Sequence, residues 1–283
     1  MKVNSPSAAV EKAAGDGIKA WNSGGSHLLA RRVIQFTMFL VGFAVAKYDP
    51  KLERVLRSAS MKDKTVIITT LNDAWAEPGS IFDLFLESFR LGNQTEKFLK
   101  HLVDTDIMWL RDPFKRFYKD TDFQIACDYF NGNSYDLNNF PNGGFNYVKS
   151  NSRTVRFYKF WFNSRSSYPK LHDQDVLNKI KKNSFISNMK LSIRFLSTDY
   201  FGGFCNHAKD FNEVLTMHAN CCVGLENKVS DLKILLEDWK KYVALPENEK
   251  KQFHPSWSIS CSTSFQRAKE RRKQKKNNKG RKL

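Results

Sequence analysis

The chain has 283 residues, of which 41% are hydrophobic and 13% aromatic, with a formal net charge of +17. This composition can bury a sizeable core, so we expect a globular protein rather than a disordered one. Residues 267–283 hold ten Lys or Arg and one Glu, and so contribute +9 of the charge. The excess therefore belongs largely to one terminal segment, which weakens the inference of a polyanion-binding domain.

The N-terminal residues divide into a leader and a candidate anchor. Residues 1–27 are rich in Ala, Gly, Ser and Lys and predict a cytosolic or disordered leader. Arg31 and Arg32 then precede a 14-residue apolar run, 33–46. The run is shorter than the roughly 20 residues that span a bilayer, so a buried helix is the alternative. The Arg pair favours a signal-anchor over 28–47, with the rest of the chain in the lumen.

The globular domain is predicted over residues 51–260, beginning with a strand and a helix. The β-branched run Thr65–Thr70 is typical of a buried parallel strand. A turn at residues 78–80 then leads into a helix, for which Ser80 is the candidate cap and Asp83 completes a capping-box-like pattern. The apolar face of this helix consists of Ile81, Leu84, Phe85 and Phe89.

Strands and helices continue to alternate along the domain. Residues 123–130 and 143–148 predict strands separated by a surface loop. Residues 154–162 and 231–243 each place aromatic and aliphatic side chains on one helical face. The alternation predicts an α/β domain with a largely parallel sheet.

Asp104, Thr105 and Asp106 form the pattern that points most directly to chemistry. Alternate residues of an extended segment point the same way, so the two carboxylates can face one ion or its water shell. Mg²⁺ and Mn²⁺ are commonly held by one or two carboxylates and complete their coordination with substrate phosphates. A pair of solvated loop aspartates is the alternative, because short motifs arise often by chance.

Longer segments resemble the plant nucleotide-diphospho-sugar transferases grouped with arabinosyl- and xylosyltransferases of the cell wall. The resemblance lies over residues 51–243, in segments such as DTDIMWLRDPF, DFQIACDYF, NGGFNYVKSN and HDQDVLN. It implies a Rossmann-like glycosyltransferase domain of the A type (GT-A). It also implies a nucleoside diphosphate sugar, such as a UDP-pentose, as donor and a cell-wall glycan or glycoprotein as acceptor, in the Golgi lumen.

The resemblance also assigns the metal and phosphate groups. Asp104 and Asp106 would bind Mn²⁺ or Mg²⁺ on the donor diphosphate, where the ion neutralises charge on the departing nucleotide. His218 resembles a further metal ligand, although an ordinary core or loop histidine fits its position as well. Gly224 resembles a glycine that lets the backbone approach the phosphates, and Lys228 resembles a lysine that places a positive charge on them.

Two further segments resemble the sugar-binding part of such sites. Asp173 and Asp175 are candidate catalytic residues that bind sugar hydroxyls or the charge developing at the reacting carbon, and Gln174 is a candidate donor ligand. Asp residues here could equally cap a helix. The donor-binding candidates on the preceding strand are Asn142, Gly143 and Gly144, for which turn formation is the alternative.

The chain departs from the family before Asp104. Only 33 residues separate Thr70 from Asp104, and one crossover fills them. A doubly wound nucleotide-binding half needs further strand and helix units there, because each parallel pair requires a crossover of a dozen or more residues. We therefore expect an internal truncation near 103/104, an incomplete sheet and impaired transfer.

The C-terminal segment and the cysteines leave alternatives open. Residues 261–283 predict a basic, disordered tail, for which we favour a solvated segment over a nucleic-acid-binding patch. Five cysteines leave at least one thiol free, and the sequence does not assign their pairing. The alternatives to a transferase are a non-catalytic lumenal binding or assembly protein and a nucleic-acid-binding protein that acts through the tail.

Overall fold

The computed structural model describes residues 73–95, 105–208, 210–256 and 259–280, together with Arg54, Arg57 and Ser60. The predicted strand Thr65–Thr70, the candidate anchor 28–47 and Asp104 lie outside the described residues. None of the helices in the described part of the chain is long and apolar enough to cross a membrane.

The described elements alternate between helices and short strands, as the sequence predicts. In chain order they are α4 (Asp73–Ala76), α5 (Ile81–Leu91), β1 (Ile107–Trp109), η2 (Pro113–Arg116), β2 (Phe123–Tyr129), β3 (Phe140–Val148), α6 (Ser152–Ser164), η3 (Arg165–Ser167), α7 (Asp173–Ile180), α8 (Ser184–Asn188), β4 (Ile193–Phe195), β5 (Phe201–Gly203), β6 (Thr216–His218), α9 (Leu225–Ala244), α10 (Glu247–Lys250) and α11 (Ser260–Gly280).

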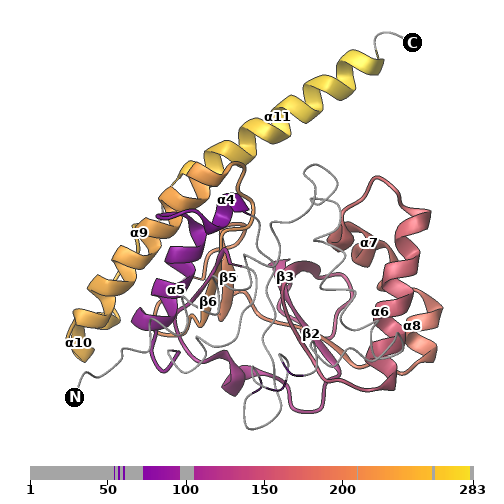
Figure 1. Cartoon of the computed structure of the whole chain (residues 1–283), viewed down its shortest axis with the longest axis horizontal. Coiled ribbons are helices and arrows are strands. Elements are labelled where there is room, and N and C mark those ends of the chain that lie inside the picture. The colour runs from indigo at the N-terminus through magenta and orange to yellow at the C-terminus, as the bar shows by residue number, and fades with distance from the viewer. Residues whose placement is uncertain are drawn as a thin grey trace.

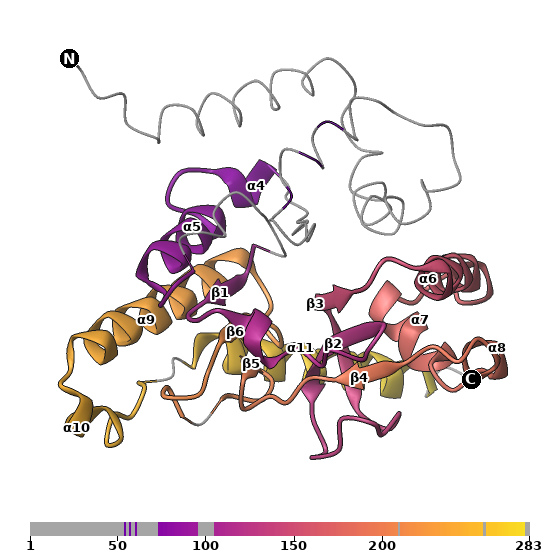
Figure 2. The same ribbon diagram turned by 90° about the horizontal axis from the view of Figure 1, so that it is seen from below.

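The described strands form two three-stranded sheets, ordered β1-β6-β5 and β3-β2-β4. In Figure 1, α5 and α9 lie beside the first sheet, and α6, α7 and α8 lie beside the second. Figure 2 shows the same two groups from below. The arrangement confirms an α/β domain with helices packed against strands.

The sheets are mixed, which corrects the prediction of a largely parallel sheet. β2 pairs antiparallel with β3 and parallel with β4, while β6 pairs antiparallel with β1 and parallel with β5. The loop between β2 and β3 spans residues 130–139, too short for the crossover that a parallel pair requires. The strand propensities predicted the elements, but connection length set their direction.

Two hydrophobic cores hold the sheets to their helices. Phe85 of α5, Trp109 of β1 and Trp239 of α9 are each at most 1% exposed and belong to the first core. Phe123 of β2 and Phe157 of α6 belong to the second. Alternate residues of a strand point to opposite faces, so β2 contributes Ala126 to the first core and Phe123 to the second, and the two cores share the β3-β2-β4 sheet as a wall.

Helix α5 begins as predicted but with a different cap. Its buried face contains Ile81, Leu84, Phe85 and Phe89. The Ser80 side chain does not cap the helix and instead donates a hydrogen bond to the carbonyl of Ala74. Asp83 accepts from the backbone N–H of Gly79, one residue earlier than a capping box requires.

The structure differs from the sequence prediction at the C-terminus, because residues 260–280 form helix α11 where disorder is expected. This stretch is rich in Lys and Arg, which are good helix formers. Its first turn is fixed to the domain by a disulfide between Cys222 and Cys261 and by a hydrogen bond from the Cys261 N–H to Asp231. A fixed first turn reduces the cost of helix nucleation.

Four of the five cysteines are paired. The second disulfide joins Cys205 to Cys221, next to Cys222 in the chain. Cys127 is free and buried, and burial raises the pKa of its thiol to about 12. This thiol is therefore packed as an apolar side chain and is not a nucleophile.

Asp122 ties the start of β2 to its neighbours. Its carboxylate accepts from the guanidinium of Arg153 at 2.7 and 2.9 Å, from the amide of Asn151 at 2.8 Å and from the N–H of Ser192 at 3.0 Å. The hydrogen bonds from Arg153 make the largest contribution to a pKa of about 2. One carboxylate thus joins β2, the cap of α6 and the segment before β4.

We predict that Asp122→Asn lowers the free energy of unfolding by about 1–2 kcal/mol at pH 7. Because the folded-state pKa is depressed, the stabilisation is complete above the unfolded pKa of about 3.9 and falls to about half at pH 3. Urea denaturation at both pH values measures this. Asp120→Asn, at a carboxylate 77% exposed, is the control. A loss of equal size at both pH values would contradict the prediction.

Candidate active site

Asp106 is a buried carboxylate at the start of β1. The residue is 2% exposed, and its backbone carbonyl accepts a hydrogen bond from the N–H of Ala219. Strand β1 is wholly buried and pairs with β6, so that Ile107 lies opposite His218. The apolar run that follows the aspartates in the sequence therefore forms the strand that places Asp106 beside His218.

Two basic side chains contact the Asp106 carboxylate. His218 Nε2 lies 3.2 Å from one carboxylate oxygen, and Lys228 Nζ lies 2.5 Å from the other. Burial alone would raise the pKa of Asp106, but the interactions with His218 and then Lys228 outweigh it and hold the pKa well below its usual range. Asp106, His218 and Lys228, here termed the Asp106 cluster, thus keep a buried carboxylate ionised.

Three of the predicted metal and phosphate residues meet in this cluster, although Asp104 lies outside the described residues. Among the residues that the structure describes, no group of three or more His, Cys, Asp or Glu could hold a metal ion. Asp106 and His218 nevertheless offer a carboxylate oxygen and an imidazole nitrogen from adjacent strands, a donor pair that suits Mn²⁺. The residues present fit such an ion as part of its ligand set.

Helix α9 brings Lys228 to the cluster. Gly224 precedes the helix with φ +97°, a conformation that L side chains rarely adopt, and Lys228 lies in the first turn. The backbone N–H groups and the positive dipole end of a helix favour anions. The start of α9 therefore offers a position for phosphate next to the Asp106 carboxylate.

A second polar cluster surrounds Asp128, at the end of β2. One carboxylate oxygen accepts from the amides of Asn142 and Asn220, and the other from the amide of Gln174, each at 2.8 Å. These four residues are termed the Asp128 cluster. They come from β2, β3, the N-terminus of α7 and the segment after β6.

The predicted sugar-binding residues lie in or beside the Asp128 cluster. Gln174 accepts a hydrogen bond from the N–H of Gly143, and Asn142 accepts one from the N–H of Gly144. A Cβ atom added to Gly143 would stand 3.9 Å from the Asp173 carboxylate. The structure therefore brings the 142–144 strand and the start of α7 together.

Asp173 and Asp175 differ in their surroundings. Asp173 is half-buried, and its backbone carbonyl accepts a hydrogen bond from the Trp161 indole. Asp175 is exposed in the first turn of α7. Of the two candidate catalytic residues, Asp173 is the one beside Gly143.

Residues 218–220 link the two clusters. His218 contacts the Asp106 side chain, Ala219 donates to the Asp106 carbonyl, and Asn220 donates to Asp128. Asn220 also accepts from the N–H of Cys205, and a Cβ on Gly203 would lie 2.4 Å from its side-chain oxygen. The position of Asn220 is thus fixed from both sides.

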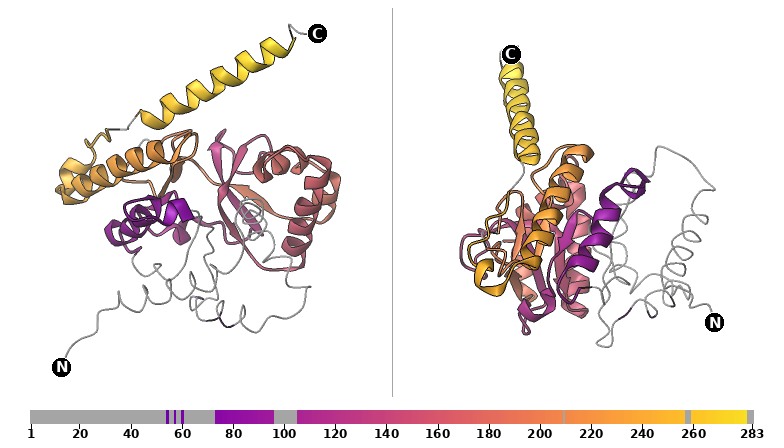
Figure 3. Two further views of the ribbon diagram at one scale, coloured as in Figure 1. Left: turned by 45° about the horizontal axis from the view of Figure 1, so that its top comes forward. Right: turned by 90° about the vertical axis from the view of Figure 1, so that its left-hand side faces the viewer.

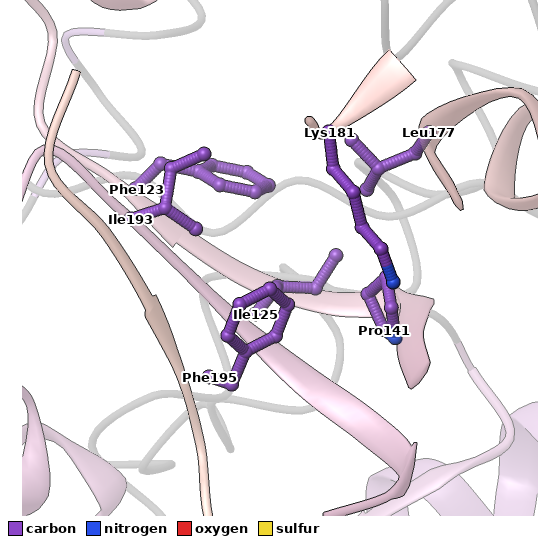
Figure 4. Close-up of a pocket in the computed structure, with 7 residues that line it drawn as sticks. All are labelled: Phe123, Ile125, Pro141, Leu177, Lys181, Ile193 and Phe195. Carbon is purple, nitrogen blue, oxygen red and sulfur yellow. The ribbon is translucent and has the colours of Figure 1, made fainter. Parts of the chain in front are cut away.

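The pocket in Figure 4 is separate from these clusters. Its lining is mainly apolar and comes from the second core and the start of β3: Phe123, Ile125, Pro141, Leu177, Lys181, Ile193 and Phe195. The Lys181 ammonium donates to the carbonyl of Asn139 and to Asn178. None of the predicted site residues lines this pocket, so we assign it to packing of the second core.

Asp128 and Asn220 are the site residues that sequence reasoning missed. Asp128 follows a run of buried strand residues and stands at the strand's carboxyl end, where ligands of α/β sheets commonly bind. That position was a usable signal. Asn220 gave no such signal, because its importance arises from a contact with a residue 92 positions away.

Comparisons with known proteins identify the family of the chain. Residues 101–232 match the nucleotide-diphospho-sugar transferase family. An uncharacterized protein of Arabidopsis thaliana is 42% identical over 251 residues, covering 69% of this chain and 68% of that protein. A second one is 30% identical, covering 76% of this chain and 84% of that protein. A crystal structure of a glycosyltransferase involved in glycosylation of the major capsid of PBCV-1 shares 12% identity and covers 56% of this chain and 78% of its own, with a TM-score of 0.31.

The α/β fold and the family match define the class, a glycosyltransferase with a partial Rossmann-like domain of the GT-A type. The chain belongs to the nucleotide-diphospho-sugar transferase family.

The alignment with the first of these proteins is longer than the part of this chain that it includes. The first spans 251 residues but takes in 69% of the 283 residues, which is about 195. The rest of the aligned length falls opposite gaps in this chain.

We predict that Asn220→Ala lowers the free energy of unfolding by about 1–3 kcal/mol, because Asp128 loses a donor and the Cys205 N–H loses its acceptor. Urea denaturation measures the loss. Asn206→Ala, which removes a hydrogen bond to Thr198 in the same loop region, is the matched control. A loss in Asn220→Ala no larger than in the control would show that the contact with Asp128 contributes little.

Proposed function

We propose that this protein transfers a sugar, specifically a pentose, from a UDP-sugar to a cell-wall glycan or glycoprotein, with Mn²⁺ or Mg²⁺ bound at the donor diphosphate. The observation that carries the proposal is the ionised, buried carboxylate of Asp106 between His218 and Lys228. Burying a charge is costly unless it is paired, and here the pairing groups are ones that suit a metal ion and a phosphate.

Asp106 and His218, with Asp104, would hold the ion, and Lys228 at the start of α9 would contact the diphosphate. A bound divalent ion supplies Lewis-acid stabilisation of the charge on the departing nucleoside diphosphate. Lys228 already neutralises part of the negative charge in this region, so a diphosphate would replace one anionic partner of the ammonium by another.

The Asp128 cluster provides the surface for the sugar. Asp128 accepts hydrogen bonds from Asn142 and Gln174, which fixes the orientation of both amides. Their remaining polar atoms, with the nearby carboxylate of Asp173, suit sugar hydroxyls and positive charge at the reacting carbon. In the transfer, the bond from that carbon to the phosphate oxygen breaks, and the nucleoside diphosphate leaves with the electron pair. A bond to the acceptor oxygen forms, and the proton of the acceptor hydroxyl passes to the departing diphosphate.

We place the reaction in the Golgi lumen, with residues 28–47 as the membrane anchor of a single-pass type II protein. The two disulfides support this location, because such bonds persist in oxidising compartments and are rare in the cytosol. The position of Arg31 and Arg32 before the apolar run supports the orientation.

A second candidate function is non-catalytic binding or assembly in the same compartment. Two observations favour it. The stretch of sequence before Asp104 is short, and the alignment with the first relative is longer than the part of this chain that it includes. A chain that lacks part of its nucleotide-binding half can keep the Asp128 cluster and the family surface while losing turnover.

We predict that Mn²⁺-dependent UDP binding is lost in Asp106→Asn, because the substitution removes the charge that the ion contacts. A decrease in affinity of at least about tenfold is expected by calorimetry. Asp199→Asn, at an exposed carboxylate between β4 and β5, is the control and should bind as the wild type does. Unchanged Mn²⁺-dependent binding in Asp106→Asn would remove the basis of the proposed metal site.

We also predict that this chain turns over UDP-pentoses much more slowly than a full-length relative, because part of the donor-binding wall is missing. The measurement is sugar transfer by both purified proteins with Mn²⁺ and matched acceptors. Comparable rates would show that the stretch between Thr70 and Asp104 is long enough for a working donor site.

A further inference from the structure

Helix α11 extends beyond the body of the domain (Figures 1 and 3). Its 21 residues make it about 30 Å long. From residue 267 onwards, here termed the basic arm, the sequence carries ten Lys or Arg and one Glu up to residue 283. The cations with described side chains are exposed: Arg267, Lys269, Arg271, Arg272 and Lys273.

Over residues 267–274, where its side chains are described, the basic arm has charge on every side and no apolar stripe. Residues 269–274 are consecutive and all exposed, which covers more than one full helical turn. A helix that inserts into a membrane interface or pairs with another helix needs an apolar face. The arm therefore offers charge alone, and its partner must be recognised by negative charge.

The base of the arm is attached beside the active site. Cys261, in the first turn of α11, is bonded to Cys222, and the N–H of Val223 donates to Ser264 in the second turn. Cys222 lies two residues from Asn220, which holds Asp128. Helix α11, which carries the arm, is thus attached at the edge of the segment that links the two polar clusters.

We propose that the basic arm binds an acidic polysaccharide. A flexible polymer of carboxylates can lie along a helix that is charged on all sides, and its attraction to the arm does not depend on a particular pocket. The disulfide at the base of the arm favours this partner over nucleic acid, because it requires an oxidising compartment. It also disfavours anionic lipid, because the negative membrane surface is that of the cytoplasmic leaflet.

If the proposed transferase function holds, this inference names the acceptor class: an acidic glycan bound to the arm would be tethered, through the start of α11, to the segment that carries Asn220 of the Asp128 cluster. Binding of the polymer stands independently of transfer, so the two proposals can fail separately. Mn²⁺-dependent UDP binding tests the first and polysaccharide binding tests the second.

The test is binding of polygalacturonate to the full chain, compared with binding of the same polymer after methyl esterification, which removes charge and keeps the backbone. In the variant, Arg267, Lys269, Arg271, Arg272 and Lys273 become Gln, a residue that retains helix propensity. The matched control replaces five exposed lysines elsewhere by Gln: Lys119, Lys159, Lys170, Lys233 and Lys251.

We expect the wild type to bind polygalacturonate in a salt-dependent manner and not to bind the ester. The arm variant should lose at least about tenfold in affinity and the control variant less than about threefold. Equal losses in the two variants would mean that net charge rather than the arm is responsible, and this overturns the proposal. Absence of binding by the wild type, or binding of phosphatidylserine vesicles without binding of polygalacturonate, also overturns it.

Thiol labelling separates the glycan from nucleic acid as the partner. Free thiols are alkylated in extracts of the cells that produce the protein, and the protein is then denatured. Cys222 and Cys261 should react with the alkylating reagent only after reduction. Free thiols at both positions would place the arm in a reducing compartment, where nucleic acid is the available polyanion, and would contradict the assignment.

Discussion

The structure depends on how one buried charge is balanced. Asp106 is 2% exposed, and an isolated carboxylate in that position would be protonated or would destabilise the fold. His218 and Lys228 arrive from β6 and α9, more than 100 residues along the chain, and both contact the carboxylate. Pairing of β1 with β6 is therefore also the step that assembles the candidate metal and phosphate site.

The segment 218–220, which begins at His218, also contacts the Asp128 cluster. Residues 218–220 contact Asp106 at one end and Asp128 at the other, so the two clusters share one short backbone segment. The disulfides lie directly after this segment, from Cys221 to Cys205 and from Cys222 to Cys261. They hold the linking segment to the turn after β5 on one side and to the first turn of α11 on the other.

The sequence predicted local structure well and long-range geometry less well. Periodicity is a local property, so the sequence predicted the apolar faces of α5 and α9 and the strand β2. The direction of β3 was not, because it depends on connection length. Family resemblance predicted Asn142 and Gln174 as donor-binding residues, whereas Asp128 and Asn220 were recognised as site residues only in the folded structure. Helix α11 differed from expectation because its anchoring is a disulfide that no spacing pattern assigns.

We propose that Asp106 and His218, at the paired strands β1 and β6, hold the ion that binds the donor. Electron spin-echo spectroscopy of bound Mn²⁺, in protein whose histidines carry ¹⁵N, tests it most directly. We predict a coupling to one imidazole nitrogen in the presence of UDP that disappears in His218→Gln. Mn²⁺ that binds with UDP but shows no imidazole coupling, or a coupling that persists in His218→Gln, would contradict the assignment.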